Sequence, residues 1–206
     1  MSYMYTRPRK RQDPIIFDPV YRPVRFDARP EIHLGTPLID TGIQNVQQYQ
    51  TANYELAWVN GPMTIQSEFT WSKLDTYGDG QRDLFGGYVH GSFFLTGEQR
   101  TYNRQLGRFG RVVPYENFWV VPTDGGPRAG WGAWEVAARW SHLSFSSVNE
   151  QYLNDFTLGV NWYWNSHSRL MFNWIHPFAH NSNIANPTDR VDSQGDIIAL
   201  RMQLDF

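Results

Sequence analysis

Apolar and polar side chains alternate with a period of two along most of this chain, a pattern that is typical of β-strands with one apolar face. The alternation predicts about eight strands, at about residues 24–34, 51–59, 63–73, 84–96, 131–144, 154–164, 169–177 and 196–206. Asn60-Gly61, between the second and third strands, is typical of a two-residue hairpin turn because both turn positions need a positive φ. The predicted fold class is therefore all-β, with antiparallel strands.

The predicted strands are about 9 to 14 residues long, whereas strands of soluble sheets usually have about five or six. A tilted strand needs about 9 to 11 residues to cross a membrane. In a transmembrane barrel the apolar face meets lipid and the other face lines a wet lumen, while in a soluble sandwich the apolar face packs on a second sheet. Alternation alone does not separate these two architectures.

Three features favour the antiparallel transmembrane β-barrel. Ionisable residues lie in mid-strand on the polar face, which suits a water-filled interior; they are Glu55, Glu68, Glu135, Arg139, Asp155, Arg169 and Arg201. Tryptophans lie near strand ends on the apolar face, as at the headgroup level of a membrane. The last strand resembles the signal that barrel-assembly machinery reads in bacterial outer-membrane proteins, because it alternates and ends in an aromatic residue. Its apolar face comprises Ile198, Leu200, Met202, Leu204 and Phe206.

Composition narrows the function classes. The 206 residues are 16% aromatic, carry a net charge of -2 and include no cysteine, which excludes disulfides, thiolate metal sites and a strongly basic nucleic-acid binder. No apolar run approaches the roughly 18 to 20 residues of a membrane-spanning helix. Basic residues near the start are not followed by an apolar stretch, so we expect residues 1–21 to be a basic, polar segment without a signal peptide. Residues 22–206 are expected to form a partial barrel, with a long irregular insertion at about 97–130.

Several stretches of the chain resemble the phosphate-selective porin O and P family. They are LTGEQRTY at 95–102, GRFGR at 107–111, RPE at 29–31, DTG at 40–42, GAWEVAAR at 132–139, GVNWY at 159–163, RLM at 169–171 and LRMQLDF at 200–206. The resemblance implies a homotrimeric outer-membrane channel of roughly sixteen strands. It covers only the C-terminal half of that family, so we expect a fragment or a mis-started reading frame. An eight-stranded barrel has an interior just filled by side chains, so a conducting pore would need further strands.

The resemblance also implies that lumen arginines attract anions, because guanidinium groups match phosphate oxygens. The pore-lining candidates are Arg25, Arg29, Glu135, Arg139, Arg169 and Arg201. Their alternative role is ion pairing with carboxylates of the same wet wall. A second basic group in the insertion comprises Arg100, Arg104, Arg108 and Arg111, and it adds positive potential to the pore only if the insertion folds inward.

The sequence predicts no enzyme, catalytic residue, cofactor or metal site, since it contains no nucleophile elbow, P-loop or dinucleotide motif. The expected partners are outer-membrane lipid, barrel-assembly machinery, two further copies of the chain and small anions as transported solutes, with no nucleic acid. Two other functions stay open: a non-conducting small outer-membrane barrel, and a soluble Trp-rich carbohydrate-binding β-sandwich. For a barrel, we expect the turns at 60–61 and 165–168 and the insertion to lie at one end.

Overall fold

The computed structural model describes residues 1–7, 23–31, 37–103, 105, 107–119, 124–126, 128–186 and 189–205, with the side chains of 181–191 left out. The strands are β1 (Ser2–Thr6), β2 (Pro23–Val24), β3 (Asp27–Ala28), β4 (Ile39–Asp40), β5 (Gln44–Asn60), β6 (Met63–Thr76), β7 (Gly80–Phe94), β8 (Tyr102–Asn103), β9 (Arg108–Phe109), β10 (Ala133–Phe145), β11 (Gln151–Tyr163), β12 (Ser168–Asn186), β13 (Asp189–Gln194) and β14 (Ile197–Leu204). One helical turn, α1 (Ser146–Asn149), joins β10 to β11.

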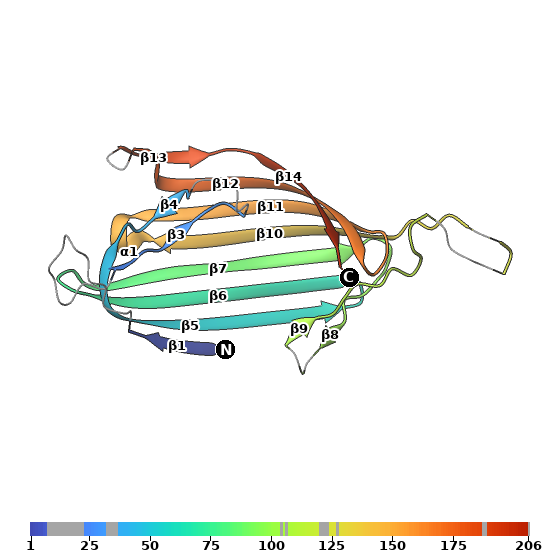
Figure 1. The fold of residues 1–206 in the computed structure, drawn as a ribbon, viewed down its shortest axis with the longest axis horizontal. Coiled ribbons are helices and arrows are strands. Elements are labelled where there is room, and N and C mark those ends of the chain that lie inside the picture. The colour runs from blue at the N-terminus through green and yellow to red at the C-terminus, as the bar shows by residue number, and fades with distance from the viewer. Residues whose placement is uncertain are drawn as a thin grey trace.

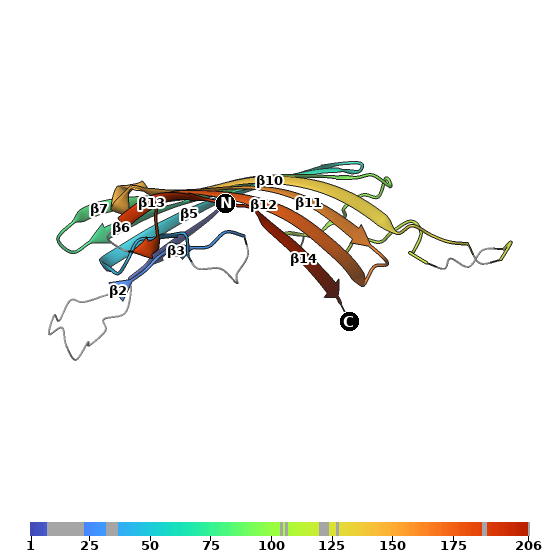
Figure 2. The same ribbon diagram turned by 90° about the horizontal axis from the view of Figure 1, so that it is seen from above.

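The long strands form one antiparallel sheet in the order β1-β5-β6-β7-β10-β11-β12, with β13 and β14 both paired to β12. The sheet is curved into an arch (Figures 1 and 2), and no ladder among the described residues joins β1 to β14. The described strands outside the arch form two separate two-stranded sheets, β3-β4 and β8-β9, which are too small to be the second layer of a soluble sandwich. The all-β antiparallel prediction is confirmed, and the sheet is open.

Each predicted strand except the one at 24–34 corresponds to a long strand, and most are longer than predicted. The strand predicted at 24–34 is wrong: only residues 23–24 and 27–28 are paired there, in two-residue strands, and residues 32–34 lie outside the described part. Pro30 lacks a ladder donor, and the stretch around it lies against the inside of the arch. Conversely, Ser2–Thr6 pairs with β5 as a strand that the sequence did not predict.

β12 is paired to two short strands because Pro177 interrupts its ladder. Ile175 faces Ile197 on β14 and Phe178 faces Gln194 on β13, so His176 and Pro177 lie opposite the break between the two strands. The carboxylate of Asp196 spans this break, since its Oδ1 is 3.0 Å from Trp174 Nε1 and 2.9 Å from His176 Nδ1. Side-chain contacts thereby replace the backbone bonds that the proline removes.

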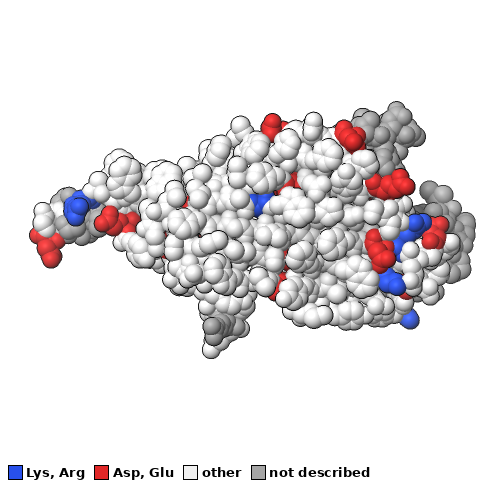
Figure 3. Space-filling model, turned by 180° about the vertical axis from the view of Figure 1, so that it is seen from behind, with Lys and Arg blue, Asp and Glu red and all other residues white. Residues whose placement is uncertain are grey.

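The two faces of the arch differ in chemistry. On the convex face, large apolar side chains such as Phe85, Val89 and Phe93 of β7 are exposed. Their counterparts on neighbouring strands are Leu56, Trp58, Phe69, Trp71, Val136, Trp140, Phe156, Leu158, Phe172, Leu200 and Leu204. Lys, Arg, Asp and Glu are sparse across the middle of this face and gather toward its ends (Figure 3). The concave face carries polar residues, among them fully buried Glu135 and Gln151.

Two inner segments cover the concave face, one at each end of the strands. The first inner segment, of which residues 23–31 and 37–42 are described, packs against one end, where Ile39, Val46 and Leu74 are fully buried. The second, described at 95–103, 105 and 107–115, covers the other end, where Val112 packs with Phe94 and Tyr163. The β5–β6 turn is Gly61-Pro62 and not Asn60-Gly61 as predicted, because Asn60 still pairs with Met63 and Gly61 alone of the two has a positive φ, +56°. This turn and the β11–β12 turn lie at the same end as the insertion, as predicted (Figure 1). Among the described residues, no helix is long and apolar enough to cross a membrane.

Candidate functional site

The insertion is fixed to the inner wall through the buried carboxylate of Glu135. Arg100 of the insertion places its Nη2 2.7 Å from Glu135 Oε1 and 2.9 Å from Oε2. The Tyr163 hydroxyl and the Asn161 amide donate to Oε2 at 2.8 and 2.9 Å. Glu135 is on β10, Asn161 and Tyr163 are both on β11, and Arg100 is on the insertion, so these contacts join the insertion to β10 and β11. The predicted pore-lining residue Glu135 therefore lies beneath the insertion.

Three arginines meet beside this ion pair at the same end of the arch. Arg100, Arg111 and Arg169 line a hollow of about 280 Å³, in which the carboxylate is that of Asp205. Arg169 donates from Nη2 to Gln203 Oε1 at 2.7 Å and from Nη1 to the Tyr163 hydroxyl at 3.3 Å. Among the described residues, neither Arg111 nor Arg169 makes an ion pair. The hollow therefore has a positive balance of charge and donors that suit an oxyanion.

Arg139 of β10 meets a carboxylate carried by the other inner segment. Its Nε lies 2.7 Å from Oε1 of Glu31, and the Thr157 hydroxyl of β11 donates to Glu31 Oε2 at 3.0 Å. The guanidinium carbon lies 4.0 Å from the centre of the Tyr88 ring, a cation–π contact. Glu31 thus attaches residues 25–31 to the middle of the wall.

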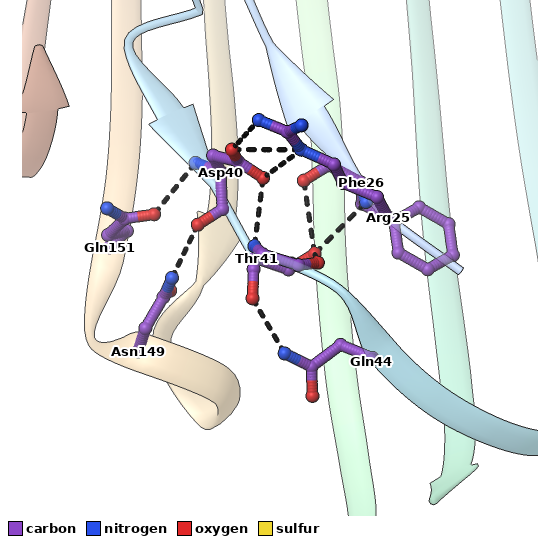
Figure 4. A network of polar contacts seen from close by, with 8 residues as sticks. Arg25, Phe26, Asp40, Thr41, Gln44, Asn149 and Gln151 are labelled. Atoms are coloured by element: carbon purple, nitrogen blue, oxygen red, sulfur yellow. Dashed lines mark hydrogen bonds and ion pairs between the residues drawn. The ribbon is translucent and has the colours of Figure 1, made fainter. Parts of the chain in front are cut away.

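A polar network around Asp40 holds the inner end of residues 23–42 (Figure 4). Arg25 binds the Asp40 carboxylate, with its Nε 3.0 Å from both oxygens, and this hydrogen bond lowers the pKa of Asp40. The Asp40 backbone is held by Gln151 at 2.8 Å and Asn149 at 2.6 Å. Gly42 N–H donates to Asp40 Oδ1 at 2.9 Å. The motif at 40–42 thereby attaches the first inner segment to α1 and β11.

The structure does not bring all predicted site residues together. Arg139, Arg169 and Arg201 lie on wall strands, and Arg201 pairs in register with Met171 on the concave face. Arg25 and Arg29 are on the inner segment and not on a wall strand. In the basic group, Arg108 is in β9, Arg111 lines the hollow with Arg100, and Arg104 lies outside the described residues.

The expected assembly signal occupies β14. Ile198, Leu200, Met202 and Leu204 are all exposed large side chains on the convex face, and Phe206 lies outside the described residues. The pattern predicted for the last strand therefore corresponds to its lipid-side face as far as Leu204.

Sequence reasoning missed the roles of Tyr163, Asn161 and Thr157 as partners of the inner segments. Their polar side chains alternate with apolar ones, which was a signal for the inner face, but nothing in the spacing indicated which carboxylate each one meets. Within the described part of the chain, no group of three or more His, Asp or Glu side chains is placed to hold a metal ion.

A curved sheet with an apolar convex face and a polar concave face, covered inside by two chain segments, is the architecture of the wall of a transmembrane β-barrel. Comparison with known proteins gives the family: residues 2–206 match the model for phosphate-selective porin O and P. The chain belongs to this family, which places it in the bacterial outer membrane.

Two curated relatives support the assignment. The chain is 28% identical to Porin O of Pseudomonas aeruginosa over 165 residues, which cover 74% of this chain and 34% of that protein. It is 29% identical to an uncharacterized protein of Caulobacter vibrioides over 123 residues, which cover 59% of this chain and 23% of that protein. The aligned part is thus about a third or less of the length of these relatives.

Proposed function

We propose that this chain forms part of the wall of a porin through which small anions of the phosphate class diffuse passively. The observation that carries the proposal is the hollow at the insertion end, where Arg100, Arg111 and Arg169 face one carboxylate, Asp205. An excess of guanidinium groups on a wet inner wall attracts anions and repels cations.

The mechanism needs no covalent chemistry. Guanidinium donors replace part of the hydration of a phosphate oxygen, and conduction requires that each contact be weak enough for release. Arg100 is held by Glu135, so Arg111 and Arg169 supply the available donors of the hollow, with Arg29 and Arg201 as further charges of the lumen. Assembly as a trimer, and recognition of the β14 face by barrel-assembly machinery, belong to the same proposal.

Arg169→Gln tests the proposal. In planar bilayers holding the complete outer-membrane protein under a salt gradient, we expect the reversal potential to show anion selectivity, and the variant to lower the anion-to-cation permeability ratio about twofold or more. Arg128→Gln is the matched control, because Arg128 is exposed on the insertion and does not line the hollow. A cation-selective parent protein, or equal effects of the two variants, would contradict the proposal.

A further inference from the structure

The ion pair of Arg139 with Glu31, at the middle of the wall, resembles an occupied oxyanion site. The donors are on the wall, and the bound anion is a carboxylate of the same chain. Arg139 and Thr157 are directly opposite each other on β10 and β11, so strand pairing fixes their spacing. The Tyr88 ring supports the guanidinium 4.0 Å from its centre. A guanidinium and a hydroxyl on a rigid sheet are donors suited to a phosphate oxygen, and here both hold the carboxylate of Glu31.

We propose that Glu31 is a tethered competitor that occupies an anion-binding site formed by Arg139 and Thr157, and that this competition sets how long phosphate stays in the lumen. The inference rests on the proposed anion conduction. Glu31 comes from the inner segment and not from the wall, so it can leave without altering a strand. A competitor attached to the chain weakens apparent ligand affinity by the fraction of time that it fills the site.

Two features of the ion pair make it displaceable. The Arg139 side chain is 36% exposed and Glu31 21%, so water reaches part of each side chain, although the Arg139 Nε atom itself is buried. Moreover, Arg139 Nε lies 2.7 Å from the carboxylate yet makes no well-directed hydrogen bond. By contrast, the pair of Arg100 with Glu135 is buried and hydrogen bonded from Nε and Nη2. The structure therefore contains one ion pair that is buried and fully hydrogen bonded and one that is partly exposed and less well directed.

The charge around Arg139 becomes less negative once Glu31 has left. Glu31 and Arg139 line two open hollows at once, and Arg29 lines one of these with Asp27. His90 faces Arg139 across the β7–β10 ladder. Two carboxylates of the wall lie nearby: Asp155, two residues from Thr157 on the same face, is 5% exposed, and Glu68 interacts with Tyr88. Removing the Glu31 charge takes away the carboxylate that contacts Arg139 directly and leaves Asp27, Asp155 and Glu68 around Arg139 and Arg29.

The test compares block of chloride current by inorganic phosphate in the complete protein and its variants. Glu31→Gln keeps the length of the side chain and an oxygen that can accept from Thr157, and removes the charge. We expect the half-blocking phosphate concentration to fall about three- to tenfold, because a competitor that fills the site most of the time weakens the apparent phosphate affinity by about that factor. The double variant Glu31→Gln/Arg139→Gln should lose this gain, because the guanidinium that phosphate would bind is gone.

Three controls separate competition from other effects. Glu55→Gln removes one negative charge from the concave face of β5 without contacting Arg139, and should leave the phosphate block unchanged. Asp40→Asn keeps the Glu31 charge but loosens the segment that tethers it, so it should give a smaller gain than Glu31→Gln because the competitor fills the site less of the time. Glu31→Asp keeps the charge but shortens its reach, and should give an intermediate gain; it serves as well if Glu31→Gln does not fold.

An unchanged block in Glu31→Gln, or an equal gain in Glu55→Gln or the double variant, would overturn the inference. These outcomes are distinct from failure of the proposed function, which shows as a cation-selective reversal potential in the parent protein regardless of Glu31.

Discussion

Glu135 is the residue on which attachment of the insertion depends. Its side chain is fully buried, and Arg100 is 17% exposed, so neither charge can be compensated by bulk water if the other is removed. Breaking a buried ion pair costs about 3 to 5 kcal/mol because the remaining charge stays desolvated. For Glu135→Gln we expect folded protein in detergent to lose about 3 kcal/mol of unfolding free energy, measured by urea titration of tryptophan fluorescence.

Protease treatment gives a second readout of the same variant. We expect cleavage within residues 95–115 to become faster in Glu135→Gln than in the parent protein, since Arg100 then has no anionic partner. Glu55→Gln is the control, because it removes an exposed inner-face carboxylate that makes no such ion pair. Equal stability of Glu135→Gln and the control would show that Glu135 does not anchor the insertion.

Residue alternation predicted which face each side chain takes but not what covers that face. Glu135 was predicted for the inner face correctly, and Arg100 was assigned to the insertion. Their contact was not predictable, because the insertion has no periodicity to fix its course. The same holds for Glu31 and Arg139, which are far apart in sequence and meet only because residues 23–42 fold inside the arch.

At the scale of elements, the strands with an apolar face toward lipid were predicted well. A register slip of one residue would turn every apolar side chain inward, so these strands must keep a regular alternation that the sequence shows. Residues 24–34 also alternate, yet they form no long strand. Their apolar residues Val24, Phe26 and Ala28 pack against the buried cluster inside the arch, not toward the convex face. Alternation with a period of two therefore shows only that a segment has one apolar and one polar side. An inner segment that lies between the wall and water shows this pattern just as a wall strand does.

The ion pair of Arg25 with Asp40 makes the attachment of the first inner segment sensitive to acid. Hydrogen bonding from Arg25 lowers the pKa of Asp40 in the folded state. A group with a lowered pKa contributes stability that is present above its unfolded pKa, about 3.9, and is lost as pH falls through the folded value. We expect residues 23–31 and 37–42 to gain amide hydrogen exchange below about pH 4, relative to the centres of β6 and β7.

Asp40→Asn provides the comparison for this prediction. The amide keeps the shape of the side chain but not the charge that binds Arg25, so exchange in the segment should be fast already at neutral pH and lose its pH dependence over this range. A variant that exchanges at the parent rate at neutral pH would show that Gln151 and Asn149 hold the segment without the ion pair.

For the whole molecule, the inner segments limit how the open sheet can close. A barrel of about eight strands has an interior that the side chains of its own wall fill. Here the concave face carries, in addition, two stretches of backbone whose side chains Ile39 and Val112 are buried against the wall. Closing β1 directly onto β14 would need the space that these segments occupy. A sheet edge cannot remain unpaired in lipid, so we expect the complete barrel to include further strands.

This argument predicts different behaviour for the isolated chain and for the protein in its membrane. The 206 residues refolded alone with lipid vesicles should give neither a band shift on heating in denaturing gels nor channel currents, because both edges of the sheet stay unpaired. Protein from an outer-membrane fraction should shift on heating and run, when boiled, well above 24.1 kDa if the added strands belong to the same polypeptide. If they come from another chain, the boiled band lies near 24.1 kDa and the refolded chain alone stays inactive. A heat-modifiable, conducting chain of 24.1 kDa on its own would mean that the inner segments leave the concave face when the sheet closes.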